Sequence, residues 1–285
     1  MTESQTMKRN KSFDGSNVLY LVATPIGNLK EFTPRALEVI SDADLVAAED
    51  TRNTYSLLAN FNIKKPLFSL REHNEKEATN HIVNEVKAGK KVVYVSDAGY
   101  PGISDPGQIL VEEAIKNDIN VSTICGSSAF INALVSSGLD TSRFFFNGFL
   151  SAKESISKQE LDFLKSKKET LIFYESPHRI GKTLKNMLEV LGDRKAVIAR
   201  ELTKINEEYI RGTLKELSEI DEATLKGEMV ILVEGSTATE DISDSEISAK
   251  VEYFIKKGLS KKDAIQVVSD VYSINKNRIK ELFNY

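Results

Sequence analysis

The chain has 285 residues, and its 38 Lys and Arg against 42 Asp and Glu give a net charge of −4. With 41% hydrophobic residues, the composition excludes a disordered or fibrous protein, and the length is typical of two domains. The single cysteine, Cys125, excludes an intramolecular disulfide and a cysteine-rich zinc site. The acidic balance excludes a uniformly basic surface but allows a local basic patch.

The first 17 residues are polar and lack the apolar stretch of a signal peptide. We therefore expect residues 1–17 to form a flexible tail of a cytoplasmic protein. No run of about 18 apolar residues occurs, so we expect no membrane-spanning helix and no membrane partner.

Short β-branched runs alternate with helical patterns between residues 18 and 140. The predicted strands are Val18–Val22, Leu45–Ala48, Val92–Val95 and Val121–Ile124. The predicted helices are Arg52–Phe61, Glu75–Ala88, Ser127–Val135 and one that begins at Pro34 after the N-cap Thr33. This order predicts an α/β domain over residues 18–140, with a largely parallel sheet and helices on both faces.

The pattern changes near residue 141, where Phe144-Phe145-Phe146 begins an aromatic strand. Further strands are predicted at Leu171–Tyr174, Ala196–Ala199, Glu208–Arg211 and Met229–Val233, with helices at Lys153–Ser166 and Ile180–Leu191. We expect residues 141–234 to form a second α/β domain of mixed character.

The C-terminal part differs in kind. Residues 235–243 are rich in Gly, Ser, Thr and acids, which is typical of a linker. Three short amphipathic helices are predicted after it, at Asp244–Lys257, Lys261–Ser269 and Lys276–Phe283. We expect residues 244–285 to form a small helical module.

Several common motifs are absent. No G-x-G-x-x-G follows a predicted strand, and Ser176 stands where a P-loop ending in Gly181-Lys182-Thr183 needs a glycine. The three histidines lie far apart in the sequence. We therefore expect no Rossmann dinucleotide site, no P-loop and no metal site.

Gly, Pro, Ser and acidic residues are concentrated directly after four predicted strands, in loops 24–28, 49–52, 96–107 and 125–129. In open α/β sheets the ligand lies at the carboxyl ends of the strands, and glycines let the backbone approach it closely. Turn formation alone explains one such loop. Loop 96–107, with three Gly, two Pro and two Asp, lies beside three others and favours a binding site.

The acid pair Glu49-Asp50 has two compatible interpretations. Asp50 or Thr51 suits the N-cap of the helix from Arg52, and the pair also suits the activation or positioning of a substrate hydroxyl. In the second domain, the mixed-charge segments 174–179 and 199–204 follow strands and are expected to line an interdomain cleft.

In combination, these segments resemble the bacterial 16S ribosomal RNA cytidine 2′-O-methyltransferases of the tetrapyrrole-methylase superfamily. The resemblance begins with Thr24-Pro25-Ile26-Gly27-Asn28 inside segment 19–29. It continues through segments 47–52, 73–75, 96–99, 103–107, 172–176, 200–204 and 226–230. The chain departs from the usual residues at Cys125, Ser127, Tyr100, Ser151 and Asn206, so Asn206 is not expected to act as an essential base.

The resemblance implies two α/β domains of that type with a cleft between them that binds S-adenosylmethionine (SAM) as methyl donor. It implies a homodimer that methylates the ribose 2′-hydroxyl of a cytidine in the decoding region of 16S rRNA, within the small ribosomal subunit. The cofactor-binding residues that it implies are Pro25, Gly27, Asp97, Gly99, Ser127, Ser128, Ala129, Tyr174, Glu201, Gly227 and Met229.

Methyl transfer requires alignment of the hydroxyl with the donor and an acceptor for the hydroxyl proton. The catalytic candidates are Asp50 and Glu49 as proton acceptors, with Lys204 or Arg200 placing the adjacent phosphate.

The helical module has a strong charge contrast. Residues 256–280 hold seven bases against two acids, and residues 240–246 hold four acids and no base. Phosphate contacts dominate RNA affinity, so a basic module would compensate for an acidic body, although lysines that merely solvate short helices remain the alternative. The RNA-binding candidates are Arg52, Lys256, Lys257, Lys261, Lys262, Lys276 and Arg278.

Two other functions stay open from the sequence. One is a methyltransferase of the same fold that acts on a small tetrapyrrole or a diphthamide precursor, against which the helical module and the Thr24–Asn28 motif weigh. The other is a non-catalytic RNA-binding protein, against which the Gly-, Pro- and Asp-rich loops weigh because phosphate binding needs basic residues.

Overall fold

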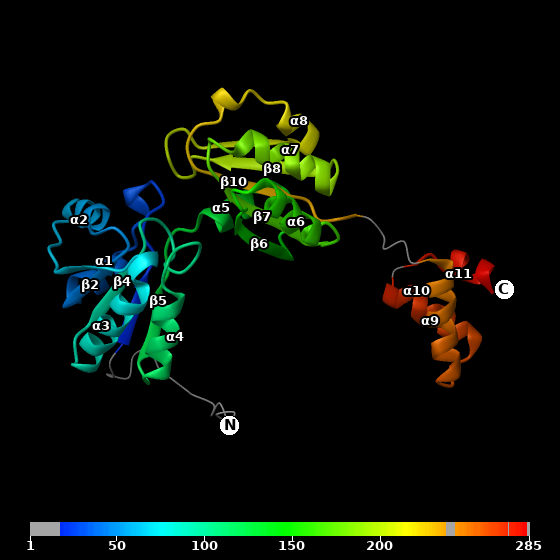
Figure 1. Ribbon diagram of the computed structural model, residues 1–285, viewed down its shortest axis with the longest axis horizontal. Coiled ribbons are helices and arrows are strands. Elements are labelled where there is room, and N and C mark those ends of the chain that lie inside the picture. The colour runs from blue at the N-terminus through cyan, green and yellow to red at the C-terminus, as the bar shows by residue number, and fades with distance from the viewer. Residues whose placement is uncertain (1–17, 238–242, 273, 284–285) are drawn as a thin grey trace. The chain divides into compact units, whose positions relative to one another are not determined.

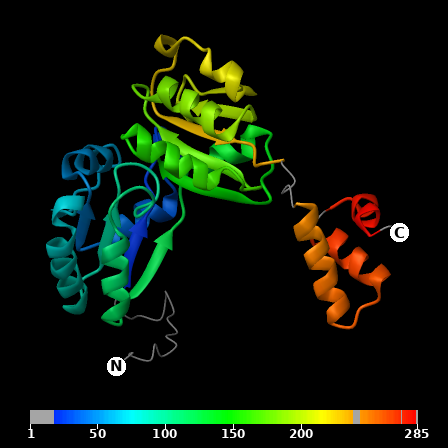
Figure 2. The same cartoon turned by 45° about the vertical axis from the view of Figure 1, so that its right-hand side comes forward.

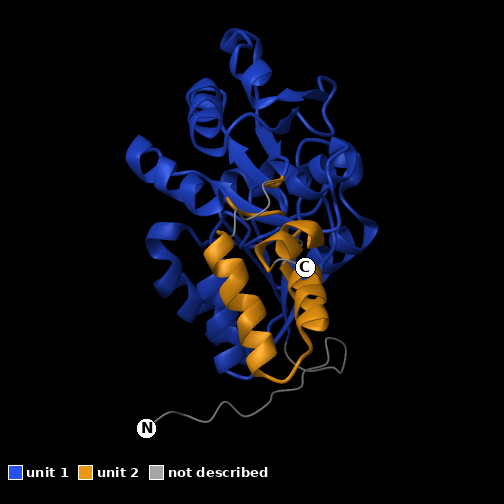
Figure 3. Cartoon of the chain, turned by 90° about the vertical axis from the view of Figure 1, so that its right-hand side faces the viewer, with its two compact units in different colours: residues 1–165, 169–234 blue, residues 166–168, 235–285 orange. Residues whose placement is uncertain are grey.

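A computed structural model of the protein describes residues 18–237, 243–272 and 274–283. Its contacts divide the chain into two compact units. Unit 1 extends to Glu234 except for Ser166–Lys168, which belong to unit 2 with the residues from Gly235 onward (Figure 3). The tail expected at residues 1–17 lies outside the described residues.

The first sheet of unit 1 has five parallel strands in the order β3-β2-β4-β1-β5. They are β1 (Val18–Val22), β2 (Leu45–Ala48), β3 (Leu67–Ser69), β4 (Val92–Val95) and β5 (Asn120–Ile124). Successive side chains of a strand point to opposite faces. In β4, Val92 and Tyr94 therefore pack in one apolar cluster and Val93 and Val95 in another.

Helices cover both faces of this sheet. One face packs against α1 (Pro34–Asp42) and α2 (Thr51–Ala59). The other packs against α3 (Glu75–Lys87) and α4 (Gln108–Lys116), which lie side by side (Figures 1 and 2). The short 3-10 helices of this half are Leu29–Glu31 and Glu72–Asn74.

The second sheet has the order β6-β7-β10-β8-β9, with β6 and β7 parallel and the other pairs antiparallel. Its strands are β6 (Phe144–Phe149), β7 (Thr170–Glu175), β8 (Lys195–Arg200), β9 (Glu208–Thr213) and β10 (Met229–Val233). One face packs against α6 (Glu154–Leu164), α7 (Ile180–Leu191) and α8 (Leu214–Ser218). The other packs against α5 (Ala129–Ser137), which follows the first sheet in the chain. A 3-10 helix, Glu222–Thr224, precedes β10.

The described part of unit 2 forms three helices, α9 (Asp244–Lys256), α10 (Lys261–Tyr272) and α11 (Lys276–Leu282). Ser243 caps α9 in a capping box with Glu246, as the sequence order of Ser and Glu favours. The helices bury a core of their own, made of Ile247, Val251, Ala264, Ile265, Val268, Ile274 and Ile279.

The predicted fold class, two α/β sheets with helices and a C-terminal group of helices, is confirmed. The sequence analysis missed β3, because three residues are too few to show periodicity, and it missed α4. It also began α5 at Ser127, two residues too early. The Ser127 hydroxyl donates instead to Glu31 Oε2 (2.9 Å), and Ser128 has the extended backbone of an N-cap.

Candidate functional site

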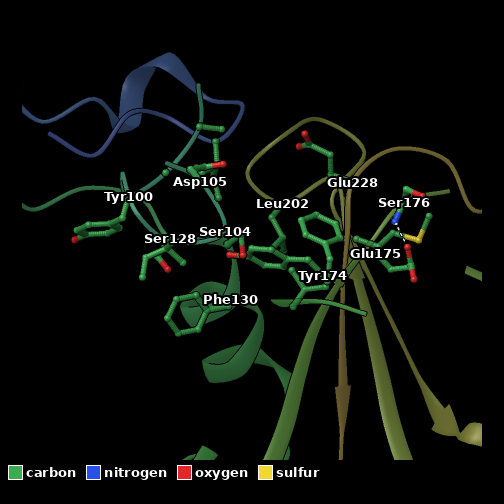
Figure 4. Close-up of a pocket in the computed structure, with 18 of the residues that line it drawn as sticks. Tyr100, Ser104, Asp105, Ser128, Phe130, Tyr174, Glu175, Ser176, Leu202 and Glu228 are labelled. Atoms are coloured by element: carbon green, nitrogen blue, oxygen red, sulfur yellow. Dashed lines mark hydrogen bonds between the residues drawn. The ribbon is translucent and has the colours of Figure 1, made fainter. Parts of the chain in front are cut away.

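A pocket in unit 1 lies where loops at the carboxyl ends of β1, β4 and β5 meet the ends of strands β6, β7 and β10 of the second sheet. Figure 4 shows Tyr100, Asp105 and Ser128 on one side and Tyr174 and Glu228 on the other. The lining residues are Ile26, Ala98, Gly99, Tyr100, Ile103, Ser104, Asp105, Ser128, Ala129, Phe130, Phe149, Tyr174, Glu175, Ser176, Pro177, Leu202, Glu228, Met229 and Val230.

Hydrogen bonds hold the three loops of the first sheet together. Thr24 and Gly99 exchange backbone hydrogen bonds (2.9 and 3.1 Å), and the Gly126 N–H donates to the Tyr100 hydroxyl (3.1 Å). Gly99 has a φ of +76°, a conformation that glycine adopts at no steric cost. The loops after β1, β4 and β5 therefore form one preorganised wall of the pocket.

The opposite wall is fixed by a buried acid. Glu175 accepts hydrogen bonds from the Thr183 hydroxyl (2.6 Å) and the Ser176 N–H (2.8 Å). Its carboxylate also lies 3.5 Å from Arg179 Nε. A buried carboxylate needs such partners, so Glu175 holds the turn between β7 and α7 in place.

The walls suit the adenosine part of SAM, the cofactor that the sequence resemblance implies. Aromatic and aliphatic side chains suit the flat adenine ring, and the hydroxyls of Ser104 and Ser128 suit a ribose. Burial raises the pKa of Tyr174 to about 12, so its phenol stays protonated at neutral pH.

A cluster of charged residues lies next to the pocket, around the N-terminus of α2. Asp97 accepts from the Asp50 N–H (3.1 Å) and from Asn53 Nδ2 (2.7 Å), and so ties the loop after β4 to this helix. Asp50 Oδ1 caps the helix by accepting from the Arg52 N–H (2.9 Å). Its carboxylate also pairs with Arg52 (2.6 Å) and Arg71 (3.4 Å). The cap interpretation of Asp50 is therefore confirmed.

The two acids of the pair have opposite pKa shifts. Burial raises the pKa of Glu49, and the Asp97 and Asp50 charges add to that effect. Hydrogen bonds from Arg52 hold the pKa of Asp50 well below its usual range. Glu49 is therefore the better proton acceptor of the two.

Five of the predicted cofactor-binding residues line the pocket, and six lie outside its lining. Gly99, Ser128, Ala129, Tyr174 and Met229 line it. Pro25, Gly27, Asp97, Ser127, Glu201 and Gly227 are not among the lining residues, although each adjoins one in the sequence or through a contact.

A second, polar pocket lies beside the loop after β8. It is lined by Arg200, Glu201, Asn206, Ala223, Thr224, Lys226 and Gly227. Arg200 pairs there with Glu208 (2.5 Å). Arg200 is the last residue of β8, and Lys204 lies in the loop that follows it. The other two catalytic candidates, Glu49 and Asp50, follow β2 of the first sheet.

Lys204 connects the two halves of unit 1. Its ammonium lies 3.0 Å from Glu201 and 3.5 Å from Glu228, and its aliphatic stem covers Gly27. Burial opposes the charge on Lys204, but the two glutamates raise the pKa overall.

Sequence reasoning missed some residues of the pocket. Asp105 stands in a segment that matched the family, but its sequence position alone indicated no role, and Phe130, Phe149 and Leu202 carry no polar signal. The three apolar residues come from the start of α5, the end of β6 and the loop after β8, so their proximity results from tertiary packing.

The RNA-binding candidates are exposed or half-buried. Arg52 has an 82% exposed side chain although it pairs with Asp50. Lys256, Lys257, Lys261 and Lys262 are exposed in unit 2. Three of the candidates have partners there: Lys261 donates to Phe283 O (3.0 Å), Lys276 to Gln266, and Arg278 pairs with Asp244 (2.8 Å).

Comparison with known proteins identifies the fold family. The model of the Tetrapyrrole (Corrin/Porphyrin) Methylases matches residues 18–218. This chain belongs to that family. The tetrapyrrole-methylase resemblance seen in the sequence is thereby confirmed.

Curated relatives match over nearly the whole chain. The ribosomal RNA small subunit methyltransferase I of Bacillus subtilis (strain 168) is 40% identical, with 98% of this chain and 99% of the relative covered. The protein of the same name from Halalkalibacterium halodurans is 43% identical over the same shares.

Solved structures support the fold. The methyltransferase CobJ superposes with a TM-score of 0.58 at 17% identity, covering 80% of this chain and 97% of its own. A diphthine synthase has the same TM-score and identity, covering 76% and 89%.

Two further observations concern the described residues. Among them, no helix is long and apolar enough to span a membrane. Nor do their His, Cys, Asp and Glu side chains form a group of three or more suited to a metal ion.

Proposed function

We propose that this protein is a SAM-dependent methyltransferase that methylates the ribose 2′-hydroxyl of a cytidine in the decoding region of 16S rRNA. The observation that carries the proposal is the 40–43% identity to small-subunit rRNA methyltransferases I over 98% of the chain. That coverage extends into unit 2, beyond residue 218 where the family model ends. The methyltransferase CobJ and the diphthine synthase match at 17% identity, which supports the fold and not a shared substrate.

When bound, SAM supplies an electrophilic methyl group. In the proposal, its contacts come from Gly99, Ser128, Ala129, Tyr174 and Met229, which line the pocket. The other six predicted residues each adjoin a lining residue in the sequence. Asp97, for example, holds Ala98 and Gly99 in place through its bonds to α2.

Proton removal from the ribose hydroxyl is assigned to the acid pair. Glu49 ranks ahead of Asp50 because two arginines hold Asp50 in its ionised form and weaken it as a base. Lys204 or Arg200 places the neighbouring phosphate, and Arg52 together with the basic residues of unit 2 binds the RNA backbone.

The substrate assignment is tested by mapping ribose methylation in 16S rRNA from cells with and without the gene. We expect one cytidine 2′-O-methyl group in the decoding region to disappear and to return with the intact gene. Purified protein with labelled SAM and small subunits provides the direct assay. Methylation of a tetrapyrrole or of a protein, with rRNA unchanged, would contradict the proposal.

The proposal includes a homodimer in the cytoplasm. Light scattering coupled to size-exclusion chromatography measures the molar mass directly. A mass near 31.8 kDa, that of one chain, would contradict the dimer.

A further inference from the structure

Three carboxylates line the pocket of unit 1, and they differ in their partners. Glu175 lies beside Arg179, and Glu228 pairs with Lys204. Asp105 has no Lys or Arg nitrogen within 4.0 Å among the residues that the structure describes. Its negative charge is therefore not neutralised by the protein in the described region.

The surroundings of Asp105 add negative charge. Glu49, at the end of β2, and Asp97, on the same loop, both repel its carboxylate, while Ser96 provides a hydrogen bond. The buried phenol of Tyr94 also interacts with Asp105. Burial, reinforced by Glu49, raises the pKa of Asp105 to about 7.

The pocket also presents aromatic rings, and these come from both of its sides. Tyr100, Phe130, Phe149 and Tyr174 line it, and the last two pack edge to face at 5.6 Å between centroids. Tyr174 stays protonated, and the Glu228 carboxylate pairs with Lys204. Neither side chain therefore offers an unpaired negative charge to a bound cation. Aromatic walls of this kind attract onium cations, because the ring faces carry negative potential.

This inference rests on the proposed use of SAM. We propose that the Asp105 carboxylate provides the counter-charge for the sulfonium of SAM and makes the pocket favour the cationic methyl donor over its neutral thioether product, S-adenosylhomocysteine (SAH).

The sulfonium fits this place better than the ammonium of the same ligand. An ammonium carries three N–H donors and needs several acceptors when it is buried. A sulfonium has no such donor, and a half-buried carboxylate between aromatic walls matches its single charge. The donor and its product share the ammonium and differ at the sulfur, so only a sulfonium contact separates their affinities.

The proposal makes SAM binding proton-linked. A cation binds the ionised carboxylate, so protonation of Asp105 must weaken SAM binding. The affinity for SAM should therefore be constant above about pH 7 and fall as the pH decreases below it, by up to about tenfold per pH unit. The affinity for SAH should change little over the same range.

The experiment is calorimetric titration of the full-length protein with SAM and with SAH between about pH 6 and pH 8. In Asp105→Asn, an isosteric change, SAM affinity at the upper pH should fall by about tenfold to a hundredfold and lose its pH dependence. SAH affinity should stay near that of the wild type. A melting curve establishes that the variant is folded.

Glu49→Gln is the matched control, because it removes a charge that acts on Asp105 and keeps Asp105 itself. The pH at which SAM affinity begins to fall should move to a lower value in this variant. Equal losses for SAM and SAH in Asp105→Asn, or a pH-independent SAM affinity in the wild type, would overturn the proposal. A wild-type protein that binds neither ligand would instead refute the proposed function.

Discussion

At the level of single residues, the surroundings give two neighbouring acids opposite pKa shifts. Glu49 and Asp50 are adjacent in the sequence, yet burial raises the pKa of the first and Arg52 lowers that of the second. Asp50 uses its carboxylate to cap α2 and to pair with two arginines. The more basic carboxylate is the one that suits proton removal.

We predict that Glu49→Gln slows methyl transfer more than Asp50→Asn does. Loss of a general base typically costs about 10²–10⁴ in rate, and Asn retains the cap acceptor at position 50. Single-turnover rates with small ribosomal subunits at saturating SAM measure the difference. If Asp50→Asn has the larger effect, the order of the two acids is reversed.

Stability provides an independent measurement on the same pair. Because the folded-state pKa of Asp50 is lowered, its ionised form stabilises the protein above the unfolded-state pKa. That contribution is lost as the pH falls through the folded-state pKa. Asp50→Ala, which also removes the cap, should lower the melting temperature at pH 7 more than Asp50→Asn does. The loss that Asp50→Asn causes relative to the wild type should shrink in acid, because the wild-type carboxylate is then protonated as well.

Among the structural elements, the pocket depends on contact between a loop of the first sheet and a loop of the second. The loop after β1 contributes Ile26, and the loop after β8 contributes Leu202. Gly27 allows this contact, since it has a φ of +144° and its missing side chain leaves room for Lys204.

We predict that Gly27→Ala destabilises the protein by about 1–3 kcal/mol and weakens SAM binding. An added Cβ would lie 2.6 Å from Lys204 Cε, so the lysine must leave its place beside Glu201. Denaturant unfolding and calorimetry measure the two effects.

The control is Gly89→Ala, because Gly89 also has a positive φ, +90°, but no atom lies within 4 Å of its added Cβ. This variant carries the backbone strain without the crowding. If both variants lose the same stability and neither loses SAM affinity, the packing of Lys204 on Gly27 does not support the pocket.

At the scale of the whole molecule, unit 1 holds the pocket, and unit 2 holds a separate apolar core and exposed lysines. Tyr253 and Lys257 illustrate its surface: the tyrosine is 57% exposed, and the ammonium lies 5.8 Å from the ring centroid. Such a surface suits contact with a polyanion.

We predict that removal of residues 244–285 leaves SAM affinity intact and weakens binding to the small ribosomal subunit. The slope of log affinity against log salt should become shallower by about 0.7–0.9 for each phosphate that the shortened chain no longer binds. Affinities at two salt concentrations, for the full-length and shortened chains, measure both effects.

A full-length variant with Lys256, Lys257, Lys261 and Lys262 changed to Gln removes the charge and keeps the helices. This variant should lose most of the affinity for the small ribosomal subunit that the shortened chain loses. Equal affinities and equal salt slopes in all three proteins would assign unit 2 another role, such as support of the dimer.

From the sequence alone we could predict the α/β character, the helices of unit 2 and the cap at Thr33. These depend on periodicity and on contacts between near neighbours, such as the Thr33 hydroxyl that accepts from the Ala36 N–H (3.1 Å). The family resemblance also came from the sequence, because its motifs are the loops at the carboxyl ends of the strands.

Which of those loop residues meet depends on the tertiary structure. It brought Asp105, Phe149 and Leu202 into one pocket from three separate elements, and it gave Asp97, which is not among the lining residues, a hydrogen bond from the Asp50 N–H. Tertiary contacts also raise the pKa of Glu49 and of Asp105 and lower the pKa of Asp50. Burial and electrostatic interactions depend on distance in space, and no spacing along the chain encodes that distance.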